Sequence, residues 1–218
     1  FYALSYIADY VWVTRQDMKA EKVKRHKAQF EYLKLKQQVN PHFLFNSLNV
    51  LDCLICENKN EDASLFVHKL SGMYRYMLKN EIDTLIPLRD ELAFVGMYTD
   101  LLKVRFSCGF EVRTDVPEEF MSFQVVPCSI QMLVENALKH NRVSPGNPLY
   151  IDMVAKDNRF IVTNTISPRM ASSEESTKVG LNYIRQQYID LSGNDIEVID
   201  DGKTYSVSLP LLPVQKTT

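Results

Sequence analysis

KQQVNPHFLFNSLNVL, residues 36–51, is the stretch around which the chain is organised. Asn40 followed by Pro41 is a helix-start signal, because asparagine can cap free N–H groups and proline fits the first turn. An amphipathic helix is expected behind the proline, since apolar residues recur at helical spacing at Leu44, Leu48, Leu51 and Ile55. His42 lies in the first turn, where a neutral imidazole can act as a nucleophile. The residues alone also allow a surface or capping histidine.

The string from Gln38 to Asn49, QVNPHFLFNSLN, closely resembles the phosphoacceptor segment of the LytS-like sensor histidine kinases. It is long, ungapped and rich in rare residue types, so chance is a poor explanation. The resemblance implies that His42 becomes phosphorylated from ATP. It also implies a homodimer and a response regulator partner, whose aspartate receives the phosphoryl group.

The bulk composition is that of a globular protein without a nucleic-acid surface. A chain of 218 residues with a net charge of −2 can form one large domain or two small ones, and it offers no excess of positive charge for nucleic acid. The cysteines show no framework of disulfide or metal-ligand spacings, and we expect reduced thiols that pack as small hydrophobes. They are Cys53, Cys56, Cys108 and Cys128.

The N-terminus changes character abruptly, from FYALSYIADYVWV to TRQDMKAEKVKRHK. The apolar part is shorter than the roughly 20 residues that span a bilayer, but aromatic residues followed by basic ones are typical of the cytoplasmic end of a membrane helix. We therefore expect residues 1–14 to be the end of a membrane helix or a lead-in helix. The first alternative makes the chain the cytosolic part of a protein at the cytoplasmic face of the bacterial inner membrane, attached through an N-terminal segment missing from this chain.

Residues 15–107 are expected to be helical, with signalling, dimerisation and histidine phosphotransfer as their function. Residues 15–39 show a weak heptad, which suggests a coiled coil but also occurs in ordinary solvated helices. After the His42 helix, which is expected to end at the polar turn 57–60, a second helix follows. Each of the two carries one apolar stripe, so paired hairpins from two chains would form a four-helix bundle. A third helix should run from Pro87 to Gly109, with Leu92 on its apolar stripe.

Residues 108–218 predict a second domain in which helices and strands follow one another. Strands are expected at 110–115, 149–155, 159–165, 195–199 and 204–209, and helices at 128–141 and 180–191. Lys156-Asp157-Asn158 and Asp201-Gly202 are turn signals, and the polar segment 167–178 is predicted to be a loop. The fold class is therefore α+β: a helical hairpin followed by an α/β sandwich, a mixed sheet with helices on one face.

The helix predicted at 128–141 carries the string LVENALKHN. Glu135 with Lys139, and Asn136 with His140, form one polar band on an otherwise apolar helix. The band alone fits a solvated side as well as a ligand site. The string is similar to the N-box of the ATPase fold shared by gyrase and histidine kinases, which implies ATP and Mg²⁺ as cofactors. By that resemblance Asn136 binds the metal, Glu135 orients or deprotonates the attacking group, and Lys139 and His140 meet phosphate oxygens.

Two further segments resemble the family's nucleotide boxes with departures. Asn164 stands where the family has an adenine-binding aspartate, and Ser167-Pro168 replaces the glycines of the lid hinge. Gly180 and Leu181 match the end of a Gly-x-Gly-Leu box, and Gly180 before a helix would bring backbone N–H groups to a phosphate. The leading function is a sensor histidine kinase that autophosphorylates His42. The departures keep a kinase-dead dimeric scaffold as the alternative, whereas an ATPase without phosphotransfer would leave the His42 string without a purpose.

Overall fold

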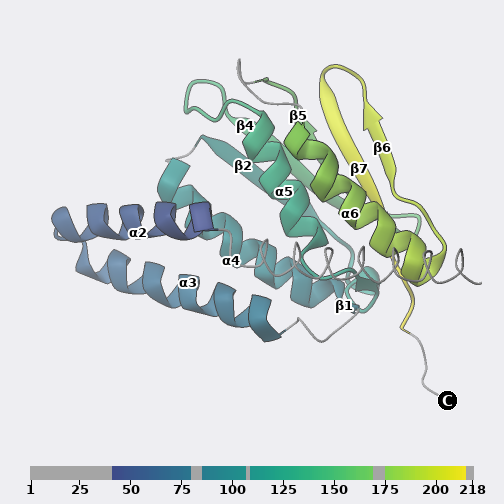
Figure 1. Cartoon of the computed structure of the whole chain (residues 1–218), viewed down its shortest axis with the longest axis horizontal. Coiled ribbons are helices and arrows are strands. Elements are labelled where there is room, and N and C mark those ends of the chain that lie inside the picture. The colour runs from purple at the N-terminus through teal and green to yellow at the C-terminus, as the bar shows by residue number, and fades with distance from the viewer. Residues whose placement is uncertain (1–40, 80–84, 107–108, 169–174, 215–218) are drawn as a thin grey trace, which may run out of the picture. The chain divides into compact units, whose positions relative to one another are not determined.

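The computed structural model describes residues 41–79, 85–106, 109–168 and 175–214 (Figure 1). The chain divides into two units, residues 1–46 and 47–218, of which the second holds almost all the described residues. The segments expected at 1–14 and 15–39 lie outside the described residues. In the part that is described, none of the helices combines the length and the apolar character needed to cross a membrane.

The first two helices follow the predicted pattern. Helix α2 spans Pro41–Cys56 and helix α3 spans Asn60–Lys79. The turn between them contains Asn58, whose φ of 58° is in the left-handed region that asparagine tolerates better than most residues. The described part of α2 starts at the predicted proline and includes His42.

Helix α4 spans Leu88–Phe106, one residue later than predicted, because Pro87 belongs to a short strand. This strand, β1 (Ile86–Pro87), pairs antiparallel with β3 (Gln124–Val125). The predicted apolar stripe is buried at Leu88, Val95, Thr99 and Leu102, whereas Leu92 is only half-buried and Glu91 beside it is fully buried. Helix α4 packs against both α3 and α5, so two of its sides have a partner and the buried set is wider than one stripe.

The main sheet has five strands in the order β2-β4-β5-β7-β6. Their bounds are β2 Phe110–Asp115, β4 Leu149–Lys156, β5 Arg159–Thr165, β6 Glu197–Asp200 and β7 Thr204–Pro210. Strand β2 runs parallel to β4 and the other pairs are antiparallel, which confirms the predicted mixed sheet. Burial alternates along β4 and β5, so one face of the sheet is covered.

Helices α5 (Ser129–His140) and α6 (Glu175–Ser192) cover that face side by side (Figure 1). Ile130 and Val134 of α5 and Ile184 and Tyr188 of α6 are fully buried in the layer between helices and sheet. The α+β class and the α/β sandwich are therefore confirmed. Between Phe110 and α5 the chain also forms a 3-10 helix, Glu118–Phe120, which was not predicted.

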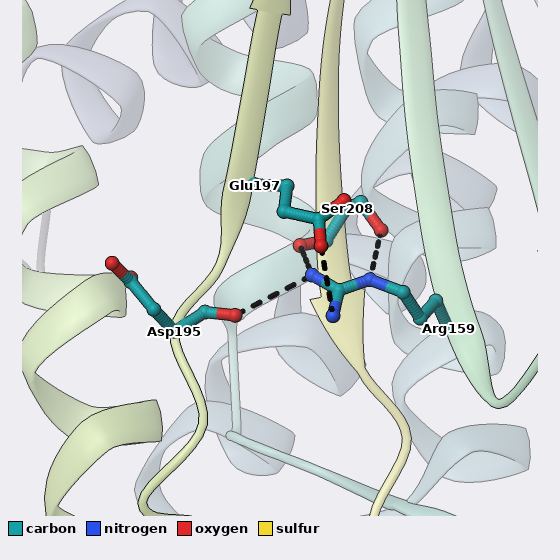
Figure 2. Close-up of polar contacts among 4 residues, drawn as sticks. All are labelled: Arg159, Asp195, Glu197 and Ser208. Carbon is teal, nitrogen blue, oxygen red and sulfur yellow. Dashed lines mark hydrogen bonds and ion pairs between the residues drawn. The ribbon is translucent and has the colours of Figure 1, made fainter.

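Two local features stabilise the sheet where β4 turns into β5. Asp157 and Asn158 join β4 to β5 with φ of 51° and 56°, the positive values of a tight hairpin turn. Next to this turn Arg159 donates hydrogen bonds to the Ser208 side chain and backbone and to the carbonyl oxygen of Asp195, and its guanidinium lies 3.5 Å from Glu197 (Figure 2). The Arg159 side chain on β5 therefore bonds to β7, to β6 and to the segment that leads into β6.

Candidate functional site

The predicted polar band lies on the less buried side of α5. Glu135, Asn136 and His140 are half-buried and Lys139 is exposed, whereas Leu133, Val134, Ala137 and Leu138 are buried against the core. A helix that packs on a sheet must turn its polar residues to the opposite side, because a buried polar group needs a partner. The four predicted α5 residues are thus brought together on one accessible side.

The start of α5 is capped from another helix. Cys128 at the N-cap position has φ of 60° and makes no side-chain cap. Instead the carboxyl of Glu91, on α4, accepts hydrogen bonds from the backbone N–H of Cys128 at 3.0 Å and of Ile130 at 3.1 Å. The first N–H groups of a helix lack partners within the helix, so this buried carboxyl satisfies them.

Burial and hydrogen bonding act in opposite directions on Glu91. Burial raises the pKa of this carboxyl to about 7, because the charged form is disfavoured away from water. Hydrogen bonds from the N–H groups of Cys128, Ile130 and Gln131 and from the Tyr76 hydroxyl lower the pKa, since they favour the charged form. Glu91 is thus a titratable group beneath the start of α5.

Glu135, the predicted base, is held by a neighbour on its own helix. Gln131 lies one turn earlier, and its Nε2 donates a hydrogen bond of 3.0 Å to Glu135 Oε2. Gln131 is in turn hydrogen-bonded to the Tyr98 side chain on α4, which is buried. A carboxylate held by a donor loses rotamer freedom and is oriented before any substrate binds.

The end of α5 is connected to the segment where the family has its hinge glycines. Asn141 is buried, and its Nδ2 donates to the Ala137 carbonyl at 2.8 Å while its Oδ1 accepts from the N–H of Ser167 at 2.7 Å. The N–H of Arg142 donates to the Ser167 carbonyl, also at 2.7 Å. Two hydrogen bonds therefore connect the start of the predicted loop 167–178 to the C-terminal end of α5.

Asn164, the predicted adenine contact, lies near the end of β5 on the helix-covered side of the sheet and is only 6% exposed. Its Nδ2 donates to the carbonyl oxygen of Thr165 at 2.8 Å. The amide nitrogen is thus used within the chain, and the amide oxygen is the atom suited to accept a hydrogen bond from a ligand. This geometry fits the acceptor role that the resemblance implies for this position.

The prediction that a helix starts at Gly180 was wrong, because the described part of α6 already includes Glu175. Gly180 therefore lies beyond the first four N–H groups, which are the ones free to meet a phosphate. A β-carbon at Gly180 would lie 3.4 Å from Met132 Cε, so this glycine faces α5 one turn before Asn136. Leu181 is half-buried beside it.

The donor set fits magnesium with a nucleotide better than a metal held by protein alone. Within the described ranges no group of three or more histidine, cysteine, aspartate or glutamate side chains could hold a metal ion. Asn136 offers one neutral oxygen, and Mg²⁺ commonly takes few protein ligands together with waters and phosphate oxygens. Asn136 is therefore suited to bind the metal of Mg·ATP, and Asn164 is suited to contact its adenine base.

Three residues of this site were not predicted: Glu91, Gln131 and Asn141. Glu91 shares the helical spacing of the buried residues Leu88, Val95 and Tyr98. A carboxylate at such a position is a signal in the sequence that could have identified Glu91. Gln131 precedes Glu135 by four residues and is its neighbour on any helix. Asn141 ends the LVENALKHN string, but its partner Ser167 is 26 residues away and nothing local indicates it.

Comparisons with known proteins agree with the resemblance seen around His42. Residues 30–110 match the family model described as Histidine kinase. The Sensor protein LytS of Enterococcus faecalis is 29% identical over 80% of this chain and 33% of its own length. The Sensor histidine kinase BtsS of Escherichia coli is 38% identical over 55% of this chain and 21% of its own length. The chain spans a third or less of these relatives.

Among solved structures, the catalytic domain of histidine kinase ThkA is similar at 18% identity, with a TM-score of 0.42. The match covers 59% of this chain and 96% of the ThkA chain.

A further sequence relative, the Sensor protein LytS of Bacillus cereus, is 40% identical over 49% of this chain and 18% of its own length. The resemblance of this chain to the LytS-like sensor histidine kinases is therefore confirmed.

Proposed function

We propose that this chain is the kinase region of a two-component sensor, which uses Mg·ATP to phosphorylate His42 and passes the phosphoryl group to an aspartate of a response regulator. A ring nitrogen of His42 forms a bond to the γ-phosphorus as the bond to the bridging oxygen breaks and ADP leaves. The imidazole gives up its proton in the process. The cofactors and the partner follow from the resemblance to the histidine kinases.

The residues of the second domain have separate roles in this proposal. Asn136 holds the magnesium ion, which when bound neutralises phosphate charge. Glu135, held by Gln131, orients the attacking group or accepts its proton. Lys139 and His140 meet phosphate oxygens, Asn164 accepts a hydrogen bond from adenine, and Gly180 with Leu181 lines the site from α6.

One observation carries the proposal: the string NPHFLFN begins a helix in the same chain whose α5 presents Glu135 and Asn136 together on an accessible side. A phosphoacceptor and a nucleotide-binding helix are both needed for autophosphorylation. We further propose a homodimer through α2 and α3, with phosphotransfer assigned to residues 15–107 and ATP binding to 108–218. We place the whole at the cytoplasmic face of the bacterial inner membrane.

The test is incubation of the purified chain with γ-labelled ATP and Mg²⁺. Label should appear as an acid-labile, base-stable phosphoramidate, and His42→Gln should abolish it while nucleotide binding continues. His68→Gln is the matched control, because His68 is an exposed histidine on α3 whose Nδ1 lies 2.7 Å from the Ser64 carbonyl oxygen. Label should persist in His68→Gln, and label that persists in His42→Gln would refute the assignment.

A kinase-dead scaffold that relays conformation through partners is the second candidate. It is favoured by the hydrogen bonds that tie Ser167 to α5, at the point where the family has hinge glycines. Calorimetry separates the two functions, because the kinase must bind Mg·ATP and the scaffold need not. If the wild type binds no nucleotide, the kinase proposal fails.

A further inference from the structure

The carboxyl of Glu91 connects three helices and has no part in the chemistry proposed above. Its Oε1 accepts from the N–H of Ile130, and its Oε2 accepts from the N–H of Cys128 and from the Tyr76 hydroxyl at 3.3 Å. Tyr76 is on α3, Glu91 is on α4, and the two N–H groups belong to the start of α5. Glu91 is fully buried, so water cannot replace any of these partners.

Tyr76 itself is held firmly where it meets Glu91. Its ring stacks on Phe94 of α4 with centroids 4.3 Å apart and planes 11° apart. Phe94 is fully buried, one turn along α4 from Glu91. A movement of α3 along α4 would therefore carry the Tyr76 hydroxyl away from the carboxyl.

The remaining N–H groups of the first turn of α5 have partners of their own. Ser129 N–H donates to the Val126 carbonyl at 3.2 Å, and Met132 N–H donates to the Cys128 carbonyl at 3.0 Å. Val126 N–H in turn donates to the Tyr188 hydroxyl on α6 at 3.3 Å. Glu91 thus provides the contact of this turn that reaches α3.

We infer that Glu91 is a positioning residue for α5, and that the Tyr76 hydroxyl makes this positioning depend on where α3 lies. The inference rests on the proposed function, because α5 matters for catalysis only if it carries the Mg·ATP site. Glu135 and Asn136 lie on the helix whose first turn Glu91 holds. A displacement of α3, which is expected to form the dimer, would reach these residues through one shared carboxyl.

The test uses Tyr76→Phe, which removes the hydroxyl and keeps the ring stack on Phe94. Glu91→Ala would leave a cavity and unsatisfied N–H groups, so the milder variant is preferred. Tyr74→Phe is the matched control, because the Tyr74 hydroxyl on α3 is buried and has no hydrogen-bond partner among the described residues. Both variants remove one tyrosine hydroxyl from the same helix.

Hydrogen exchange of the backbone amides of Cys128 and Ile130 is measured first, because it does not depend on catalysis. Exchange at these amides should accelerate on the order of tenfold in Tyr76→Phe and stay at the wild-type rate in Tyr74→Phe. Unchanged exchange in Tyr76→Phe would overturn the inference, whether or not the chain is a kinase.

The second measurement is the labelling rate of His42 at saturating ATP, below the melting temperature of each variant. Tyr76→Phe should lower this rate more than it weakens ATP affinity, whereas a purely structural contact would lower only the melting temperature. A normal rate in Tyr76→Phe together with faster exchange would overturn the positioning role. Absence of label in the wild type would instead refute the proposed function. The hydrogen-exchange result would still test the contact between Tyr76 and Glu91.

Discussion

Glu91→Gln should change how the stability of the fold depends on pH. The pKa of Glu91 is raised by burial to about 7 from an ordinary value of 4.5. The folded state therefore binds more protons than the unfolded state between these two pH values. Stability must then fall as pH rises from about 4.5 through about 7, because the buried carboxyl is forced to ionise.

The magnitude follows from the size of the pKa change. Each pKa unit corresponds to about 1.4 kcal/mol, so a rise from 4.5 to about 7 corresponds to about 3 kcal/mol of unfolding free energy. Roughly 2.5 kcal/mol of this is lost between about pH 5 and about pH 8. Glutamine does not ionise, so the unfolding free energy of Glu91→Gln should not show this loss as pH rises.

The two tyrosines that face Glu91 do not titrate in this range. Burial raises the pKa of Tyr76 on α3 and of Tyr188 on α6 far above the ordinary tyrosine value. Cys128 faces the carboxyl with its backbone N–H. The histidines of the chain are common to both proteins, so the comparison of wild type with Glu91→Gln cancels their contribution.

The assay is urea unfolding followed by circular dichroism, for wild type and Glu91→Gln, at about pH 5 and about pH 8. The unfolding free energy of the wild type relative to the variant should fall by roughly 2.5 kcal/mol from the lower to the higher pH. Glu119→Gln replaces an exposed carboxyl and controls for the change of group. A difference that stays constant, or that grows with pH, would refute the reasoning and show that the hydrogen bonds outweigh burial.

Three further predictions concern the dimer and the nucleotide. Leu48→Glu should dissociate the dimer, because Leu48 is 46% exposed in the single chain and a charge in an apolar seam costs free energy; a wild type that sediments as a monomer well above micromolar concentration would contradict this. Asn136→Ala should abolish Mg²⁺-dependent ATP binding without unfolding α5, since alanine favours helices and offers the metal no oxygen. Asn164→Asp should tighten ATP binding, because a charged acceptor forms the stronger hydrogen bond to a donor; calorimetry that shows equal affinity for wild type and Asn164→Asp would refute the adenine role.

Elements with strong local signals were predictable from the sequence. Strands β2 and β5 have the predicted bounds, and the Asp157-Asn158 turn has the positive φ values that its residue types favour. The polar band of α5 follows from neighbours three or four residues apart. In all these cases the interacting groups are close in sequence, so a short string contains the cause of the structure.

Contacts between distant residues were decided by tertiary packing alone. Glu91 meets Cys128 across 37 residues, and the Gln124 N–H donates to the Leu212 carbonyl near the end of the described chain. The sequence determined the long helices and the five strands of the main sheet, and it placed Asn136 on the polar band of one helix. Only the packing of α4 between α3 and α5 decided that a glutamate would cap α5, because a cap from another helix requires a neighbour in space that no local pattern specifies.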